Sequence, residues 1–161
     1  MDDDTIPQPS SLEKLCDKIV KNNEVGFACS LALWSDGNVH EMNIPSFINK
    51  TDEQTGCQLV EQSSFVSLIV RKDIVMKIGL PYKEFFIWAD DVEYTKRIIK
   101  NGYKGIFVED SIVIHKTKEN YGPNLSTAPI ATAWKFYYGF RNQVFIRRHK
   151  YNNTTQLFHL S

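Results

Sequence analysis

The fold class is decided by residues 85–115, which read FFIWADDVEYTKRIIKNGYKGIFVEDSIVIH. A short apolar run at 85–88 leads into a helix that is expected over 90–101, and Gly102 ends that helix. Two short strands are expected next, at 104–108 and 111–114, because β-branched and apolar residues dominate both segments. A helix set between apolar strands is typical of an α/β domain.

The remainder of the chain continues this alternation. We expect a helix from 10 or 11 to about 22, strands at 26–34 and 63–70, a hairpin return strand at 39–42, a short helix at 71–78 and a long amphipathic helix over 130–150. The apolar stripe of the last helix is predicted to comprise Ile130, Trp134, Tyr137, Tyr138, Val144 and Phe145. Residues 43–62 are polar, lack clear periodicity and are predicted to form a loop. The sequence therefore predicts one α/β domain with a mixed sheet and a long C-terminal amphipathic helix.

Composition narrows the functional classes. The 161 residues suffice for one domain, and 42% of them are apolar. Lys+Arg and Asp+Glu are equal at 19 each, so the net charge gives no indication of nucleic-acid binding. Three cysteines without C-x-x-C spacing (Cys16, Cys29 and Cys57) argue against a zinc site and for reduced thiols in the cytoplasm.

Contact with a membrane is expected to be peripheral at most. The chain has no signal peptide and no apolar run that is long enough to span a bilayer. Basic residues gather near its end, at Arg141, Arg147, Arg148 and Lys150. A solvated helix face is the simpler interpretation of these residues, and contact with the anionic inner face of a membrane stays open.

An acidic triplet and a histidine are the first candidate site. Asp2, Asp3 and Asp4 open the chain, and His115 ends a predicted strand. Clustered carboxylates suit a hard cation such as Mg²⁺ or Mn²⁺, and an imidazole favours Mn²⁺. If the triplet is extended, Asp2 and Asp4 project to the same side and could bind a cation together with His115. A disordered acidic terminus and a structural histidine are the alternatives.

A second acidic cluster follows Trp88, at Asp90, Asp91 and Glu93. Helix capping explains one aspartate, and Glu93 can pair with Arg97 across one turn. A helix N-terminus lowers a carboxylate pKa, so one of the two aspartates is expected to be ionised and able to act as a base. Trp88 offers a flat face for a sugar ring, or else packs in the core.

Together these segments resemble the inverting glycosyltransferases of family 2, which have the GT-A fold, and most closely their galactofuranosyltransferase and rhamnosyltransferase-like branch. The resemblance covers residues 1 to about 151. It is carried by MDDDTIP at 1–7, GLP at 79–81, FFIWADDVEY at 85–94 with Arg97, GY at 102–103, His115 and the segment YYGFRN at 137–142.

The resemblance implies the fold of a partial GT-A domain and a set of site residues. The implied metal ligands are Asp2, Asp4 and His115, the implied catalytic base is Asp91, and the implied substrate-binding residues are Asp3, Trp88 and Asp90. Residues 1–151 would form the metal- and acceptor-binding part of such a domain, and 152–161 a tail. The family's nucleotide-binding half precedes the first motif and is not in this chain, so the chain alone is expected to be inactive.

The expected function is metal-dependent, inverting transfer of a sugar. The implied donor is a UDP- or dTDP-sugar, the implied acceptor is a glycan or cell-surface polysaccharide, and the implied cofactor is Mn²⁺ or Mg²⁺. A non-catalytic fragment that binds carbohydrate or a partner is the first alternative, and self-association into a homo-oligomer stays open. A metal-dependent phosphohydrolase is the second alternative, because clustered aspartates also serve that chemistry.

Overall fold

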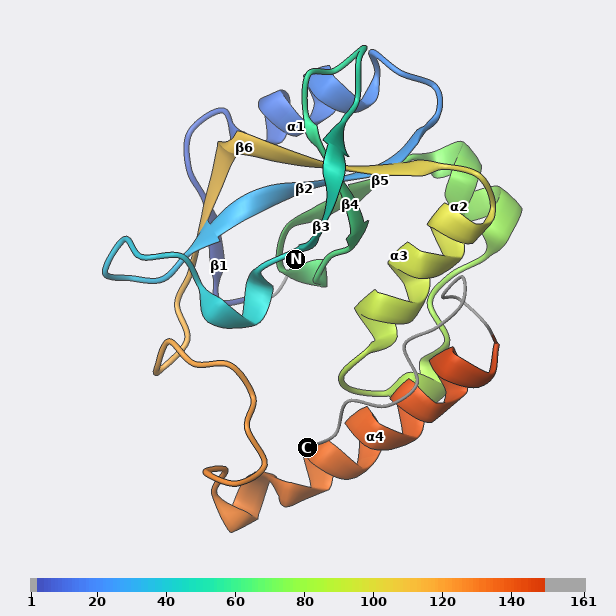
Figure 1. The fold of residues 1–161 in the computed structure, drawn as a ribbon. Helices are drawn as coiled ribbons and strands as arrows, with labels where there is room; N and C mark the ends of the chain where they lie inside the picture. The colour runs from blue at the N-terminus through green and yellow to red at the C-terminus, as the bar shows by residue number, and fades with distance from the viewer. Residues whose placement is uncertain (1–2, 150–161) are drawn as a thin grey trace.

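The computed structural model describes residues 3–149 and shows a mixed α/β fold (Figure 1). Its strands are β1 (Thr5–Pro7), β2 (Val25–Leu33), β3 (Ser46–Thr51), β4 (Gln58–Gln62), β5 (Leu68–Val70) and β6 (Lys104–His115). Its α-helices are α1 (Ser11–Ile19), α2 (Lys72–Ile78), α3 (Asp90–Lys100) and α4 (Ala133–Arg148), and its short 3₁₀ helices are η1 (Glu41–Asn43), η2 (Phe65–Ser67), η3 (Lys83–Phe85) and η4 (Ile130–Thr132).

The strands form one mixed sheet in the order β3-β4-β6-β2-β5, and β1 pairs with the end of β6. The central strands β2 and β6 are parallel, while β4, β5 and β1 run antiparallel to their neighbours. β6 is one continuous strand where two were expected. Its pairing with β2 stops at Val108 and resumes at Ile112, so residues 109–111 stand outside the regular pairing. Glu109 and Asp110 break the apolar pattern, which therefore predicts two strands.

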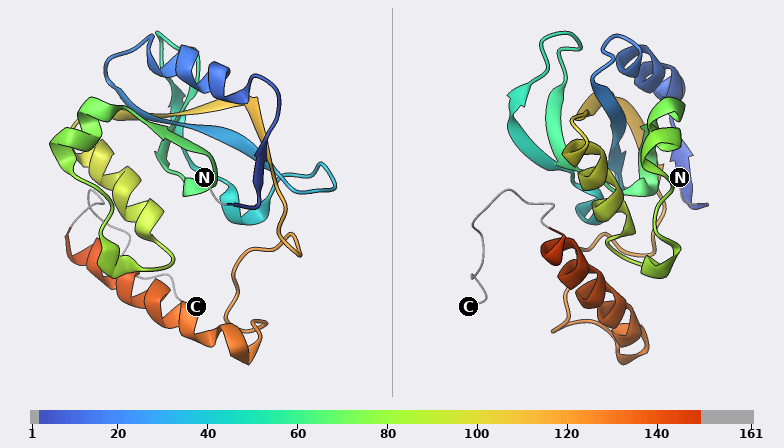
Figure 2. Two further views of the ribbon diagram at one scale, coloured as in Figure 1. Left: turned by 180° about the vertical axis from the view of Figure 1, so that it is seen from behind. Right: turned by 90° about the vertical axis from the view of Figure 1, so that its right-hand side faces the viewer.

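Helices cover both faces of the sheet (Figure 2). On one face α1 packs Leu15 and Ile19 against apolar side chains of β2 and β6. On the other face α2 and α3 bury Ile74 and Ile98 against Phe27 of β2. Gly105 of β6 lies under the Phe27 ring, where a Cβ atom would come within 2.1 Å of a ring carbon, so no side chain fits there.

The predicted loop at 43–62 is wrong, because this segment contains the antiparallel hairpin of β3 and β4. β3 lies at the edge of the sheet and most of its side chains are exposed. An edge strand with little buried surface needs no alternation of apolar and polar residues, so periodicity gave no signal. The expected strands at 39–42 and 63–70 are also shorter: the first is a single bridge from Val39 to Leu33, and η2 occupies the start of the second.

α4 lies away from the sheet and reaches the remainder of the fold at the loop before α3 (Figures 1 and 2). The predicted apolar stripe is wrong as a buried face, because Ile130 is 94% exposed and Tyr137 is 65% exposed. The helix instead buries Phe136, Asn142 and Ile146, which lie on another side of its circumference. The side of α4 that is buried is the one that contacts the loop at 85–89, and hydrophobicity alone does not predict it.

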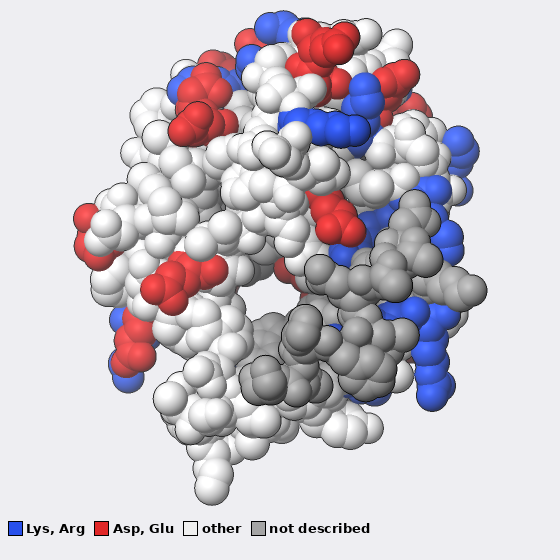
Figure 3. Space-filling model, in the orientation of Figure 1, with Lys and Arg blue, Asp and Glu red and all other residues white. Residues whose placement is uncertain are grey.

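The net charge of zero hides an uneven surface. In the view of Figure 3, basic side chains gather over α2 and the C-terminal end of α4, and most acidic side chains lie elsewhere. Among the described helices none is long and apolar enough to cross a lipid bilayer.

Candidate functional site

The carboxyl end of β6 and the segment before β1 bring Asp4 and His115 together. In the antiparallel pairing of these strands Thr5 lies opposite His115, and the Lys116 amide donates a hydrogen bond to the Asp4 carbonyl over 2.9 Å. The side chains meet as well, with 3.2 Å between Asp4 Oδ1 and His115 Nε2. Carboxyl ends of parallel strands are where α/β folds commonly bind ligands.

The geometry of the acidic triplet differs from the extended segment that was expected. Residues 3 and 4 form a turn, and β1 begins only at Thr5. Asp4 therefore reaches His115 through the turn, while Asp3 is exposed to solvent. Asp2, the other predicted metal ligand, lies outside the described residues.

The Asp4–His115 pair fits a divalent cation in donor chemistry. A carboxylate oxygen and an imidazole nitrogen are a donor set that Mn²⁺ accepts. The hydroxyl of Thr5, next to Asp4 in the chain, is buried and has no hydrogen-bond partner among residues 3–149. Within residues 3–149 no three His, Cys, Asp or Glu side chains are grouped to hold a metal. A complete site would need Asp2 or a ligand from the substrate.

His115 is held by two neighbours that the motif analysis did not select. Its Nδ1 lies 2.7 Å from Asn43 Oδ1, and its ring stacks on that of His40 with 4.4 Å between centroids. His40 Nε2 in turn lies 2.8 Å from the hydroxyl of Thr117. Burial, and next the proximity of His115, lower the pKa of His40. The lowered pKa favours the uncharged form of the His40 ring that stacks on His115.

Asp91 lies in the first turn of α3, and its carboxyl group is largely shielded from solvent. Burial raises the pKa of Asp91 to about 7, and the negative charge of Asp90 adds to the rise. Hydrogen bonds from the Val92 amide, over 2.7 Å, and from the Phe65 amide act in the opposite direction. The expected lowering by the helix N-terminus is thus outweighed for Asp91 by loss of solvation. A carboxyl group that titrates near pH 7 is suited to act as a general base.

The loop before α3 has an unusual backbone. Phe86, Trp88 and Ala89 have φ angles of 60°, 59° and 64°, a region that residues other than glycine rarely adopt. Asn142 of α4 holds this loop, because its Nδ2 donates hydrogen bonds to the carbonyl oxygens of Phe85, Ile87 and Trp88 over 2.9, 3.2 and 2.7 Å. Strained backbone that is held by surrounding contacts is common at functional sites.

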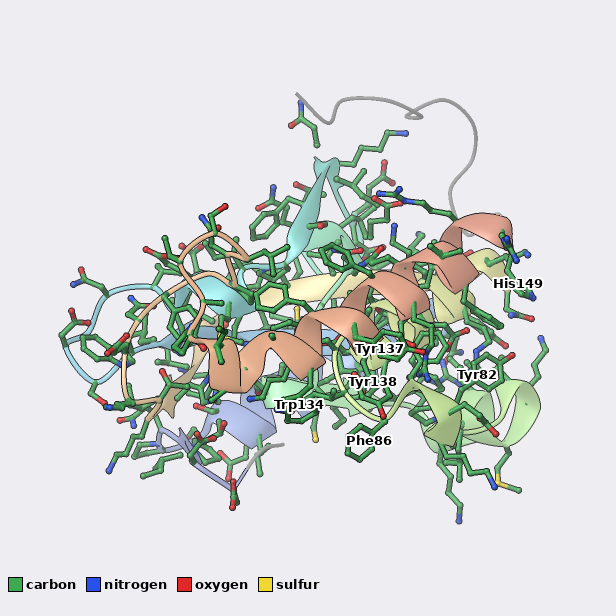
Figure 4. All side chains as sticks on the ribbon, turned by 90° about the horizontal axis from the view of Figure 1, so that it is seen from below. Tyr82, Phe86, Trp134, Tyr137, Tyr138 and His149 are labelled. Atoms are coloured by element: carbon green, nitrogen blue, oxygen red, sulfur yellow. The ribbon has the colours of Figure 1, made fainter. Side chains whose placement is uncertain are left out.

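Trp88 and the outer aromatics surround this loop. The Trp88 ring meets Phe136 edge-on with 4.8 Å between centroids and lies against Gly139, so it is half-buried under α4. Phe86, Trp134 and Tyr138 form a neighbouring group on the side that Figure 4 shows, where Phe86 lies 5.2 Å from Tyr138 and 6.2 Å from Trp134. Arg141 does not stand free for an anion, since its guanidinium donates to the Glu84 carbonyl and lies over the Tyr138 ring.

A short path of contacts joins the two parts of the site. Asn43 accepts from His115 through Oδ1 and donates through Nδ2 to the hydroxyl of Ser64 over 3.1 Å. The next residue, Phe65, directs its amide to the Asp91 carboxyl group. α3 runs toward the start of β6, so its first turn, which carries Asp91, lies at the opposite end of the helix from that start (Figure 1).

Motif analysis offers little reason to select His40, Asn43 or Ser64. His40 has no chemical motif around it, Asn43 is the first residue of the predicted loop 43–62, and Ser64 lies in the predicted strand 63–70. The one available signal was that a long polar segment inside a compact domain is often functional. The contacts that reveal these residues join positions that are 72 and 21 residues apart.

Comparisons with known proteins leave the family open. A scan of the chain against models of protein families gives no match, and a search of curated proteins gives no significant match.

Proposed function

We propose that the chain provides the metal- and acceptor-binding part of a metal-dependent inverting glycosyltransferase with a GT-A fold. The donor would be a nucleotide-diphosphate sugar, with UDP or dTDP as the nucleotide, and the acceptor would be a glycan. One observation carries the proposal: a carboxylate–imidazole pair lies at the end of the central strands, and a contact path links it to a buried carboxyl group with a pKa near 7.

Asp4 and His115, together with Asp2, would hold Mn²⁺ or Mg²⁺. When bound, that cation supplies positive charge that neutralises the departing diphosphate. Asp3, at the exposed turn, would contact the donor sugar. These residues therefore act on the donor and its leaving group.

Asp91 would act on the acceptor. Its carboxylate accepts the proton of the acceptor hydroxyl as that oxygen attacks the anomeric carbon from the face opposite the diphosphate, and this single displacement inverts the anomeric centre. Asp90 and Trp88, on either side of the strained Ala89, would bind the acceptor. Burial of Asp91 serves this role, because a carboxylate with a raised pKa is a stronger base.

The donor half of this proposal is tested by calorimetric titration of UDP into the chain of residues 1–161, with and without Mn²⁺. Because the chain supplies the metal site and not the nucleotide pocket, we expect weak UDP binding through the diphosphate that is measurable only with Mn²⁺, and a loss of at least about tenfold in that affinity for His115→Ala, because an imidazole ligand is removed. His149→Ala, which changes an exposed histidine at the end of α4, is the matched control and should behave like wild type. Equal UDP affinity with and without Mn²⁺, or wild-type titrations for His115→Ala, would contradict the proposal.

A further inference from the structure

We infer that Asn43 is a positioning residue, which fixes the tautomer and the ring orientation of His115 so that Nε2 presents its lone pair toward Asp4 and a cation there. The inference deepens the proposed function and rests on it for the identity of the group that His115 binds. It concerns a residue outside every motif that led to the proposal.

The hydrogen bonds of Asn43 determine which nitrogen of His115 carries the proton. Asn43 Nδ2 donates to Ser64, so its Oδ1 is the end that faces His115 Nδ1 at 2.7 Å. An amide oxygen only accepts, and His115 Nδ1 must therefore carry the hydrogen. In the neutral ring Nε2 is then the unprotonated nitrogen.

That unprotonated nitrogen lies 3.2 Å from Asp4 Oδ1. A lone pair that faces a carboxylate oxygen is electrostatically unfavourable unless a positive charge lies at that position, either as a proton on Nε2 or as a metal ion. Ligating histidines usually donate their other ring N–H to an oxygen acceptor, which fixes the tautomer and the ring plane. Asn43 is placed to be that acceptor.

The surroundings leave His115 little freedom to turn away. His115 is 5% exposed and Asn43 is 8% exposed, and the ring of His40 stacks on one face of the His115 imidazole. A half-turn of the ring would place a carbon against Asn43 Oδ1 and leave a buried acceptor without its donor, which costs about 1–3 kcal/mol.

The Asn43 side chain is itself held by η2. Ser64 precedes η2, and η2 is fixed to the centre of the sheet by a buried chain of hydroxyls in which Ser67 donates to Ser30 over 2.8 Å and Ser30 lies 2.7 Å from Ser111. Phe65 in the same turn directs its amide to Asp91. Residues 64 and 65 thus contact both the Asn43 side chain that holds His115 and the carboxyl group of the proposed base.

The first test needs no metal and no activity. The tautomer of each histidine in the metal-free chain of residues 1–161 is read from long-range ¹H–¹⁵N correlations at pH 8, with His115 identified by its loss in His115→Gln. We expect the Nδ1–H form for His115 in wild type and a shift toward the commoner Nε2–H form in Asn43→Ala. Asn43→Asp retains an acceptor oxygen and should restore the Nδ1–H form. An Nε2–H tautomer in wild type would overturn the inference without any variant.

The second test measures Mn²⁺ affinity from the EPR signal of free Mn²⁺. We expect Asn43→Ala to weaken Mn²⁺ binding roughly 10–100-fold, the usual effect of removing the hydrogen-bond partner of a ligand. Asn22→Ala is the matched control, because Asn22 is also a buried asparagine with both amide ends bonded, to Asp52 and the Glu24 amide. Asn22→Ala should lose stability while keeping wild-type Mn²⁺ affinity.

The two tests separate the inference from the proposed function. Unchanged Mn²⁺ affinity in folded Asn43→Ala would overturn the positioning role even if wild type binds Mn²⁺ and UDP as proposed. A wild-type chain that shows the Nδ1–H tautomer but binds no Mn²⁺ would support the positioning of His115 by Asn43 and would count against the transferase proposal.

Discussion

Burial of the Asp91 carboxyl group destabilises the fold at alkaline pH and supplies the proposed site with a carboxyl group of raised pKa. Its pKa is raised to about 7 because burial, and then the charge of Asp90, disfavour the ionised form. A raised carboxyl pKa means that the folded state binds this proton more tightly than the unfolded state does. The associated stability is complete below the unfolded pKa and is lost as the pH rises through about 7.

Asp91→Asn should therefore stabilise the chain at alkaline pH. We expect its free energy of unfolding to exceed that of wild type by up to about 4 kcal/mol at pH 8 and to match wild type closely near pH 4, since the pKa rises from 3.8 to about 7 and each unit of pKa shift corresponds to about 1.4 kcal/mol. Urea denaturation at the two pH values measures this difference.

In the active enzyme the same change should slow transfer by roughly 10²–10⁴-fold while Mn²⁺-dependent UDP binding persists. A variant that is less stable than wild type at pH 8, or that turns over normally, would refute the role given to Asp91.

Among the elements, α3 contains a buried ion pair whose arginine also holds the end of α2. Arg97 Nε lies 3.0 Å from Glu93 Oε1, and the Arg97 guanidinium also donates to the carbonyl oxygens of Ile78 and Leu80 over 2.8 and 3.0 Å. Arg97 further lies over the Tyr82 ring. The expected pairing of Glu93 with Arg97 is confirmed, and the structure adds that Arg97 anchors the turn after α2.

Arg97→Leu should destabilise the domain by about 3–5 kcal/mol, because it leaves the carboxylate of Glu93, a 1% exposed residue, buried without a partner. Thermal and urea unfolding measure the effect. The double variant Glu93→Met with Arg97→Leu should recover much of the loss, since an apolar pair of similar size removes the unpaired charge. Arg71→Ala breaks a more exposed pair with Asp73 and should cost less than about 1 kcal/mol. If Arg97→Leu and Arg71→Ala lower the free energy of unfolding equally, burial of the Glu93–Arg97 pair makes no difference to stability.

At the scale of the whole molecule, α4 is attached mainly through the strained loop that precedes α3. The contact includes the hydrogen bonds of Asn142 to three loop carbonyls and a small apolar cluster in which Ile146 meets Phe85 and Ala89. A helix of 16 residues is marginal in isolation, so the order of α4 depends on this contact. The loop in turn depends on α4 to retain three residues at positive φ.

Asn142→Leu should loosen α4 and the loop together and leave the sheet intact. Hydrogen exchange followed by mass spectrometry is expected to speed up over residues 85–92 and 133–148, while β6 retains wild-type protection. Gln143→Leu changes the exposed neighbour of Asn142 and is the control. Wild-type exchange in α4 of Asn142→Leu would show that the three carbonyl contacts do not hold the helix.

Local sequence signals determined much of the architecture. The α/β class, the mixed sheet, and the helices at α1, α2 and α3 follow from apolar periodicity and from stop signals such as Gly79 and Gly102, which act within a few residues. Asp4 does lie beside His115, as the motif order led us to expect, and their role as ligands stays a prediction.

The remaining features follow from contacts between distant parts of the chain. The β3–β4 hairpin, the buried face of α4, the raised pKa of Asp91 and the hold of Asn43 on His115 all depend on surroundings that the local sequence does not contain. An edge strand needs no alternation of apolar and polar residues. The buried side of a docked helix depends on the surface that it contacts, and the pKa of a carboxyl group depends on how far the fold shields it from solvent. Each of these is a property of groups that the chain brings together from distant positions.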